Sequence, residues 1–401
     1  MARIVCTWEL GGNLGHLSRL AGLAGELHQR GHEVIFIFRE LHLAQKVFGT
    51  HTPYQFFQAP LHHQQTSTSR NPLTFSEILL CNGYADEQTL SYLIKAWKSL
   101  LEMISPDLII YDYSPTALLA SQTFNIPKIE LGTGFFIHPD ESPMPCFSTT
   151  QQISKEQRLK SDITVLNTIN HALSREGLTP IEKIFDIFKN VRQLLTTYSE
   201  LDCYKNREGA EYVGALTNKS TGIPATWKTD SPRIFAYLKP SYKKLPALLD
   251  ALACTKAEIK IYIPNISEEL LKKYQSKNIE FSTLPYSIDE AINGCSISIC
   301  HAGHDTIVHS LLGGKPLLLI PQYIEQLEVA KKVSAIGCGL LANNNTENKD
   351  SLLEKLQTLL EKKSFQENAN QFANDYKDMS IEKCINHVSN ICAQLLKTNH
   401  E

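Results

Sequence analysis

Residues 300–339 read CHAGHDTIVHSLLGGKPLLLIPQYIEQLEVAKKVSAIGCG, and they predict two consecutive strand–loop–helix units. Residues 296–300 (SISIC), which end at the first residue of this stretch, form a short apolar run typical of a strand. Residues 305–312 carry apolar side chains at helical spacing. A second apolar strand is predicted at 316–320, where a following proline ends it before another helix begins. Alternating strands and helices predict an α/β fold with a doubly wound parallel sheet.

Polar residues lie at the predicted start of each of these helices. His301, Gly303 and Thr306 lie in the first turn, where unpaired N–H groups and the helix dipole favour a diphosphate. Glu325 and Gln326 lie at the next helix start, beyond the carboxyl end of a strand. A carboxylate beside an amide suits a polyhydroxylated ligand, because one accepts hydrogen bonds and the other both accepts and donates them.

The spacing H-x-G-x-x-T, then G-x-P, then an acidic residue followed by Gln resembles the donor signature of the UDP-glycosyltransferase family, of the inverting macrolide and natural-product type. The resemblance implies the GT-B fold, in which two Rossmann-like doubly wound domains face each other across a cleft. It implies that the diphosphate is held by His301, Gly303, His304 and Thr306, and that the sugar hydroxyls are held by Glu325 and Gln326.

Four positions depart from the family pattern. Most members have Asp where Glu325 stands and Asn where Val329 stands, and plant members have a ribose-binding Glu where His309 stands. The usual aromatic base-stacking position is occupied by Leu284, which precedes Pro285. We therefore expect the base and ribose to lie against Leu284, Pro285 and His309, with uracil not distinguished from thymine.

A fifth departure follows the first strand of the second domain, where residues 237–244 read YLKPSYKK. The family has Gly and Ser or Thr there, close to the diphosphate. Lys239 or Ser241 is a candidate substitute, and the alternative is that Lys239 is a solvated lysine.

The N-terminus predicts an opening βαβ unit, with strands at 4–8 and 33–38 and a helix between them. The connecting loop, ELGGNLG, contains neither G-x-G-x-x-G nor G-x-x-x-x-G-K, so it does not favour a dinucleotide or a triphosphate. His16 follows this loop. In the same family a Gly-His pair at this place carries the general base that deprotonates the acceptor hydroxyl.

Histidine suits that task because its ordinary pKa lies near neutrality and one ring nitrogen can accept a proton while the other is held. The expected partner is Asp112, which closes the apolar strand beginning at Leu108 on the same rim as His16. The resemblance implies that an Asp from about this segment orients the histidine. The alternatives are that His16 only caps a turn and that Asp112 caps a helix before Pro115.

Helical patterns are predicted at 75–104 and, after a proline-rich loop, at 137–201. In this fold class such inserts line the acceptor site. The acceptor-contact candidates are accordingly Asn13, Trp97, Phe135 and Phe136, with His138 and Phe147 beside them; the alternative is that these aromatic residues belong to the core.

Residues 216–232 have the Gly, Pro, Ser and Thr content of a linker. We therefore expect an N-terminal acceptor-binding domain at 1–215, a nucleotide-sugar domain at 233–380, and a final helix at 381–401 that, by resemblance, crosses back to the first domain. Further strands are predicted at 233–238, 258–264 and 279–283, and C-terminal helices at 364–397.

Composition adds bounds on the protein class. A net charge of -3 over 401 residues argues against a nucleic-acid surface. No stretch approaches the roughly 20 apolar residues of a membrane span, so at most peripheral membrane contact is expected. Ten cysteines occur without any C-x-x-C pair, which is typical of reduced core residues in a cytoplasmic protein. The oligomeric state is left open.

No cofactor is expected beyond the sugar nucleotide as co-substrate, and no metal. The chain has no D-x-D pair, and a zinc site at His301, His304 and His309 would have unsuitable spacing. The predicted function is that of an inverting glycosyltransferase that moves a hexose from a nucleoside diphosphate sugar, expected to be UDP-linked, to a hydroxyl of a small or lipid-like acceptor. The alternatives are a sugar-nucleotide 2-epimerase, a non-catalytic nucleotide-sugar-binding helper, and an ordinary βαβ protein without this site.

Overall fold

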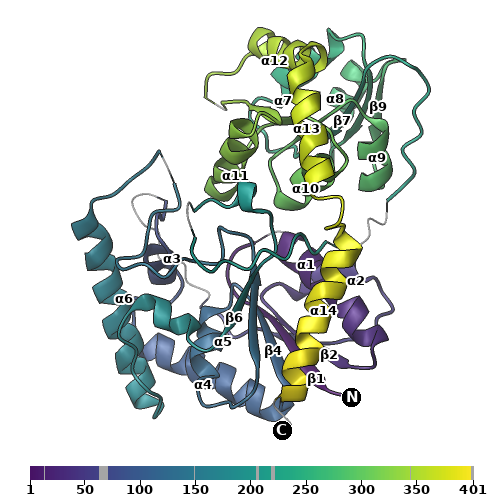
Figure 1. Ribbon diagram of the computed structural model, residues 1–401. Helices are drawn as coiled ribbons and strands as arrows, with labels where there is room; N and C mark the ends of the chain where they lie inside the picture. The colour runs from purple at the N-terminus through teal and green to yellow at the C-terminus, as the bar shows by residue number, and fades with distance from the viewer. Residues whose placement is uncertain are drawn as a thin grey trace. The chain divides into compact units, whose positions relative to one another are not determined.

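The computed structural model of the protein describes residues 1–12, 14–62, 71–148, 150–204, 207–217, 222–343 and 345–398. The chain forms two compact units (Figure 1). The N-terminal unit comprises Met1–Asn218 with Ile381–Glu401, and the C-terminal unit comprises Lys219–Ser380. Each unit is built on a six-stranded sheet, so each has its own core.

The sheet of the N-terminal unit has the strand order β3-β2-β1-β4-β5-β6, and the strands pair in parallel. This order reverses between β1 and β4, which is the switch point where ligands bind in open α/β sheets. The strands are β1 (Arg3–Trp8), β2 (Glu33–Phe38), β3 (Gln55–Gln58), β4 (Leu108–Asp112), β5 (Lys128–Gly132) and β6 (Arg192–Leu195).

The sheet of the C-terminal unit repeats this topology, with the order β12-β11-β10-β7-β8-β9 and parallel pairing throughout. Its switch point lies between β7 and β10. The strands are β7 (Arg233–Tyr237), β8 (Glu258–Tyr262), β9 (Ile279–Ser282), β10 (Ile297–Cys300), β11 (Leu317–Leu319) and β12 (Gly339–Leu341). The prediction of two Rossmann-like doubly wound domains is confirmed.

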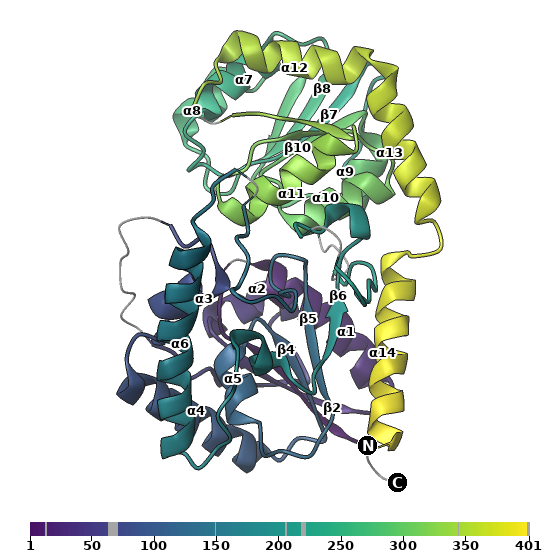
Figure 2. The ribbon, with the colours of Figure 1, turned by 60° about the vertical axis from the view of Figure 1, so that its left-hand side comes forward.

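Helices connect successive strands in both units (Figure 2). Those of the N-terminal unit are α1 (Leu14–Gln29), α2 (Ala44–Phe48), α3 (Phe75–Cys81), α4 (Glu87–Ile104), α5 (Pro115–Ala120), α6 (Lys155–Arg175) and the C-terminal α14 (Ile381–Thr398). Those of the C-terminal unit are α7 (Leu245–Ala253), α8 (Glu268–Tyr274), α9 (Ile288–Gly294), α10 (His304–Leu312), α11 (Ile324–Ala335), α12 (Lys349–Glu361) and α13 (Lys363–Asp375).

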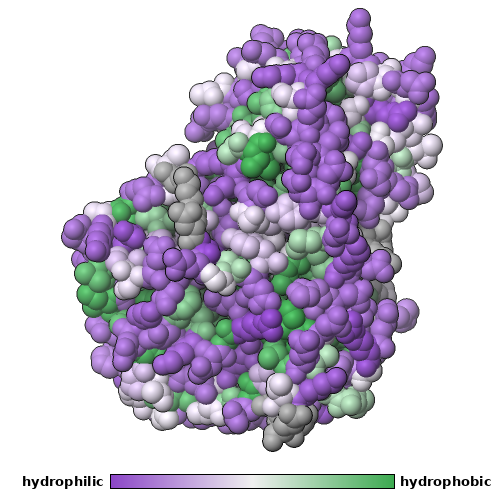
Figure 3. All heavy atoms as spheres, in the orientation of Figure 1, coloured by the Kyte–Doolittle hydropathy of each residue, from purple (hydrophilic) through white to green (hydrophobic). Residues whose placement is uncertain are grey.

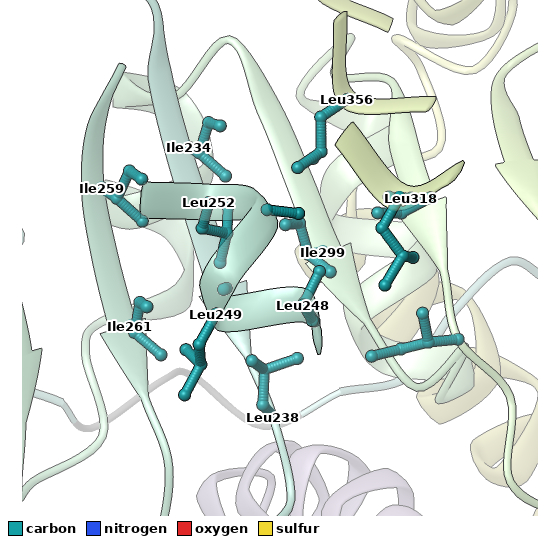
Figure 4. Packing of buried hydrophobic residues seen from close by; sticks show 14 of the residues in the cluster. Ile234, Leu238, Leu248, Leu249, Leu252, Ile259, Ile261, Ile299, Leu318 and Leu356 are labelled. Atoms are coloured by element: carbon teal, nitrogen blue, oxygen red, sulfur yellow. The ribbon is translucent and has the colours of Figure 1, made fainter. Parts of the chain in front are cut away.

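The core of the C-terminal unit shows why its strands β10 and β11 are almost entirely apolar. Leu248, Leu249 and Leu252 of α7 pack against isoleucines of the central strands, among them Ile234 and Ile299 (Figure 4). A parallel sheet is covered on both faces, so consecutive residues of its strands are all buried. This explains the near-continuous apolar runs from which the strands were predicted.

The last helix, α14, packs on α1 although about 360 residues separate them in the sequence. Arg30, just after α1, donates hydrogen bonds to Asn390 Oδ1 (2.7 Å) and Asn386 Oδ1 (3.1 Å) of α14. Both helices belong to the N-terminal unit, and Figure 2 shows α14 running alongside that unit. The predicted helical stretch 364–397 is therefore two helices, α13 in one unit and α14 in the other.

The prediction of helix throughout 137–201 is wrong at its C-terminal end. Residues Arg192–Leu195 form β6, which pairs in parallel with β5. The four residues, RQLL, are too few to show a strand period, and their pairing with β5 depends on residues about 60 positions earlier. The local pattern therefore does not contain the signal that makes this segment a strand.

Within the described residues, no helix is sufficiently long and apolar to span a bilayer. The face of the molecule in Figure 3 is largely hydrophilic, with hydrophobic side chains in scattered places. Leu159 and Ile163, one turn apart on α6, are among the exposed large apolar residues. Peripheral membrane contact stays a prediction.

Candidate active site

The switch point of the N-terminal sheet brings the two predicted catalytic residues together. Trp8, the last residue of β1, pairs with Asp112, the last residue of β4. Helix α1 begins at Leu14, soon after β1, and places His16 in its first turn. The His16 Nδ1 atom lies 2.7 Å from Asp112 Oδ1. Since a carboxylate only accepts hydrogen bonds, Nδ1 carries a proton, and in the neutral ring the lone pair is on Nε2.

A third residue, Arg19, also binds Asp112, and this contact was not predicted from the sequence. Its Nη1 atom donates to Asp112 Oδ2 at 2.5 Å, so each carboxylate oxygen has its own partner. Asp112, His16 and Arg19 are only 0%, 3% and 4% exposed. A buried carboxylate is tolerated when it is paired and hydrogen-bonded on both oxygens. Arg19 follows His16 by one helical turn, which is the signal from which it could have been found.

The His16 ring is enclosed by aromatic side chains and by the glycine-rich loop. It stacks on Trp8, with ring centroids 5.3 Å apart and planes at 17°, and contacts Phe136 at 4.6 Å. A Cβ atom on Gly11, whose φ is +79°, would lie 2.7 Å from His16 Nε2. Glycine is therefore required there both for its conformation and to leave space beside the nitrogen that carries the lone pair.

The two alternative roles for this pair do not match the geometry. Helix α5 is capped at Ser114, and the carboxylate of Glu9 accepts from the Thr116 N–H at 2.9 Å, so Asp112 does not cap this helix. Glu9 also accepts from the Thr116 hydroxyl. Burial raises the pKa of Glu9 to about 7. His16 lies inside α1 and bonds to Asp112 rather than capping a turn.

A buried ion pair holds the loop that carries Phe136. Asp202 accepts from Arg207 Nε at 2.9 Å, and Arg207 Nη2 donates to the main-chain oxygens of Gly134 (3.2 Å) and Ile137 (2.8 Å). The loop is thus anchored by a charged group at several points, which fixes the phenylalanine against the His16 ring. No regular pattern in the sequence marks Asp202 or Arg207, so this anchor was not predicted.

The predicted acceptor contacts lie in different parts of the N-terminal unit. Phe135 and Phe136 lie in the loop after β5, and Phe135 packs on Phe147 at 4.6 Å. His138 is fully buried nearby, and burial holds its pKa well below the usual range. Trp97 is fully buried in α4, as expected of a core residue. The structure describes residues 12 and 14 but not Asn13, so that candidate lies outside the described residues.

The switch point of the C-terminal sheet carries His301, which directly follows β10. Its Nδ1 lies 3.0 Å from the main-chain oxygen of Ile320, and its Nε2 accepts from the main-chain N–H of Lys239 at 2.8 Å. A carbonyl can only accept and an N–H can only donate, so Nδ1 carries the proton and Nε2 does not. Burial lowers the pKa of His301 to about 4, so the ring is neutral near pH 7.

The start of α10 has the geometry of an anion-binding turn. Gly303 is its N-cap residue, and no described residue outside its chain neighbours places a heavy atom within 4 Å of the position of a Cβ there. Ala302 before it has a φ of +57°, which is uncommon for a residue with a side chain. Thr306 is buried in the first turns of the helix, and His304 opens it. The first N–H groups of α10 are therefore placed beside His301.

The candidate sugar contacts lie at the start of α11. Gln326 is buried, and its Oε1 accepts from the Gln322 N–H at 2.8 Å, so half of this amide stabilises the turn before the helix. Glu325 is half-buried and interacts electrostatically with Lys239. A basic side chain, Lys239, thus follows β7, and an acidic side chain, Glu325, follows β11.

The candidate base and ribose residues form two groups. His309 of α10 lies with its Nδ1 2.8 Å from Asp289 Oδ1 of α9, and this hydrogen bond lowers the pKa of Asp289. Leu284 is 58% exposed, and Pro285 is exposed beside it and accepts from the Ile223 N–H at 2.9 Å. An exposed leucine after β9 is available for an apolar contact.

Among the described residues, no group of three or more His, Cys, Asp or Glu side chains is arranged to hold a metal ion. His301 and His309 have the separate partners given above, and the zinc arrangement of His301, His304 and His309 is not formed. The cysteines of the described chain are all free thiols.

Comparisons with known proteins agree with this architecture. Residues 247–384 match the glycosyltransferase family 28 C-terminal domain. Zeaxanthin glucosyltransferase from Pantoea ananas is 23% identical over 391 residues, covering 88% of this chain and 87% of the relative. Two solved structures share the fold at 15% identity: glycosyltransferase VinC in complex with DTDP (TM-score 0.73, 99% of both chains) and the calicheamicin glycosyltransferase CalG4 (TM-score 0.72, 99% of this chain and 98% of that one).

Proposed function

We propose that this chain, which has the GT-B fold and matches a glycosyltransferase domain over residues 247–384, moves a hexose from a nucleoside diphosphate sugar to an acceptor hydroxyl with inversion. The observation that carries this proposal is the buried His16–Asp112 pair, with the proton on Nδ1 and the lone pair on Nε2. A hydroxyl is a poor nucleophile until its proton is being removed, and this nitrogen is arranged to remove it.

The reaction is a single displacement. The acceptor O–H bond breaks as its proton passes to His16 Nε2, and the oxygen bonds to the anomeric carbon. The bond from that carbon to the diphosphate breaks, and the electron pair leaves with the nucleoside diphosphate. Attack from the side opposite the leaving group inverts the anomeric centre. Asp112 stabilises the imidazolium that forms, as a carboxylate does in a catalytic triad.

The donor is proposed to bind the C-terminal unit at the start of α10, with Gly303, His304 and Thr306 around the diphosphate. The dipole and N–H groups of α10 stabilise negative charge on the departing diphosphate. Glu325 is proposed to bind the sugar hydroxyls, with Gln326 contributing the amide nitrogen that the turn does not use. The donor is proposed to be UDP-linked.

The acceptor is proposed to be a small or lipid-like alcohol. Two observations support this class: aromatic side chains surround His16, and the Pantoea relative is named for zeaxanthin, a hydroxylated carotenoid. We propose that the protein acts in the cytoplasm, where nucleotide sugars are made.

The test is His16→Ala, with His28→Ala as a matched control, since His28 is an exposed residue of the same helix. Product formation is measured with several nucleotide sugars against a panel that includes hydroxylated carotenoids and polyketide aglycones, and donor affinity is measured by calorimetry. His16→Ala should lower transfer about 10²- to 10⁴-fold and leave donor affinity unchanged. Full transfer by His16→Ala would end this mechanism. Donor binding without transfer by the unmodified protein would indicate a nucleotide-sugar-binding helper.

A further inference from the structure

The ring of His301 joins three neighbouring strand ends. In the sheet, β10 lies between β11 and β7. His301 follows β10, its Nδ1–H donates to Ile320 just after β11, and its Nε2 accepts from Lys239 just after β7. The ring is 6% exposed and contacts Tyr242 edge-on at 5.6 Å. It therefore bridges the loops on both sides of the C-terminal switch point.

This arrangement leaves the ring without a proton for a phosphate oxygen. Both nitrogens already have partners whose chemistry permits only the neutral Nδ1–H form. To donate to a diphosphate, His301 would have to break one of these buried hydrogen bonds, and to carry charge it would have to gain a proton against the effect of burial. A cationic side chain that binds the diphosphate is therefore a residue other than His301.

Lys239 is placed to supply that charge. It is the second residue after β7, so it lies at the switch point, where ligands of open α/β sheets bind. Its main chain is held by the His301 ring, and its Nζ atom lies 5.6 Å from the centre of the Tyr323 ring. Burial lowers the pKa of Lys239, while Glu325 acts in the opposite direction. Lysine binds phosphates as a point charge.

We propose that His301 is a positioning residue that joins the strand ends as a neutral bridge, and that Lys239 supplies the positive charge for the donor diphosphate. The second part rests on the proposed function, because it requires a nucleoside diphosphate ligand. The two residues act together: the bridge fixes the backbone from which the lysine side chain extends. The negative charge of Glu325 favours the charged form of this lysine.

The first experiment compares UDP with uridine, which lacks the diphosphate. Both are titrated by calorimetry into the unmodified protein, Lys239→Met and Lys243→Met. Lys243 is an exposed lysine four residues further on and serves as the control. Lys239→Met should weaken UDP about tenfold or more while uridine changes less than about twofold, because a charge-assisted contact is lost. Unchanged UDP affinity in Lys239→Met would overturn the assignment and leave Lys239 a solvated lysine.

The second experiment tests the bridge with His301→Ala and His301→Gln. A glutamine amide can donate through Nε2 and accept through Oε1, as the neutral ring does, but it cannot carry charge. His301→Ala should weaken UDP about tenfold, and His301→Gln should restore the affinity to within about threefold. If His301→Gln weakens UDP binding as much as His301→Ala does, the role of His301 as a neutral bridge is contradicted.

Nitrogen-15 NMR of the histidine rings gives a reading that does not depend on affinity. His301 should show the Nδ1–H neutral form both in the free protein and at saturation with UDP. Protonation of Nε2 on adding UDP would show that the ring itself binds the diphosphate. If the unmodified protein binds neither UDP nor TDP, the proposed function fails and the Lys239 assignment fails with it, whereas the ring spectrum of the free protein still decides the bridge.

Discussion

Removal of Arg19 is the sharpest test of the buried network around Asp112. Arg19→Met deletes the donor at 2.5 Å from Asp112 Oδ2 and keeps a side chain of similar length. Asp112 is 0% exposed, so water cannot replace the lost partner. Breaking a buried ion pair by removing one member costs about 3–5 kcal/mol. We expect the free energy of unfolding of the N-terminal unit to fall by about this amount.

A double-mutant cycle separates this pair from general damage to the core. Asp112→Leu alone leaves the charge of Arg19 buried without its partner and should also cost about 3–5 kcal/mol. The double variant Arg19→Met, Asp112→Leu removes both charges, so it should lose clearly less than the sum of the single variants. A coupling energy of about 2 kcal/mol or more is expected, at the upper part of the range for residues in direct contact.

The assay is urea unfolding followed by tryptophan fluorescence, in which Trp8 and Trp97 report on the N-terminal unit and Trp227 on the other. Arg175→Met is the matched control, because Arg175 is exposed and lies 3.8 Å from Glu87. An exposed pair of this kind contributes about 0–1 kcal/mol. The reasoning is refuted if Arg19→Met costs no more than this control, or if the two single variants are additive.

Three further predictions concern pH, the ion pair of Lys260 with the partly exposed Glu280, and metal. Burial raises the pKa of Glu130 to about 8, so the folded chain keeps a proton that the unfolded chain releases above about pH 4.5. Between these two pH values this group lowers the free energy of unfolding by up to about 1.4 kcal/mol per pH unit. Glu130→Gln should remove that pH dependence in urea unfolding at pH 5, 7 and 8.5, and the same pH dependence in both proteins would refute the effect. Lys260 is 2% exposed and donates to Glu280 at 3.0 Å, whereas Glu280 reaches solvent. Glu280→Ala leaves the buried lysine charge without this partner, so it should destabilise the protein clearly more than Lys260→Met, which leaves only a solvated carboxylate. Calorimetric melting of both variants checks this order. Transfer should survive EDTA, because the chain has no D-x-D pair and we assign the diphosphate charge to a lysine and a helix N-terminus; loss of turnover that magnesium restores would contradict that assignment.

The sequence by itself determined the doubly wound fold, because most strands and helices of a parallel α/β sheet have a local signature; β6 is the exception. The apolar run at 297–300 and the helical spacing after it lie within one short segment, and β10 and α10 form there as predicted. The same rule places Asp112 at the end of β4 and His16 in the helix that follows β1. Parallel strands end at one edge of a sheet, so residues that follow different strands come together there.

Tertiary structure alone decided which partners these side chains take. The pairing of Arg192–Leu195 with β5, the contact of Arg19 with Asp112, and the two hydrogen bonds of His301 join residues that are about 20 to 90 positions apart. A histidine after a strand has the same local pattern whether its ring faces a ligand or bridges two loops. The difference depends on which main-chain groups the folded sheet brings beside its nitrogens, and burial then determines the protonation state of the ring.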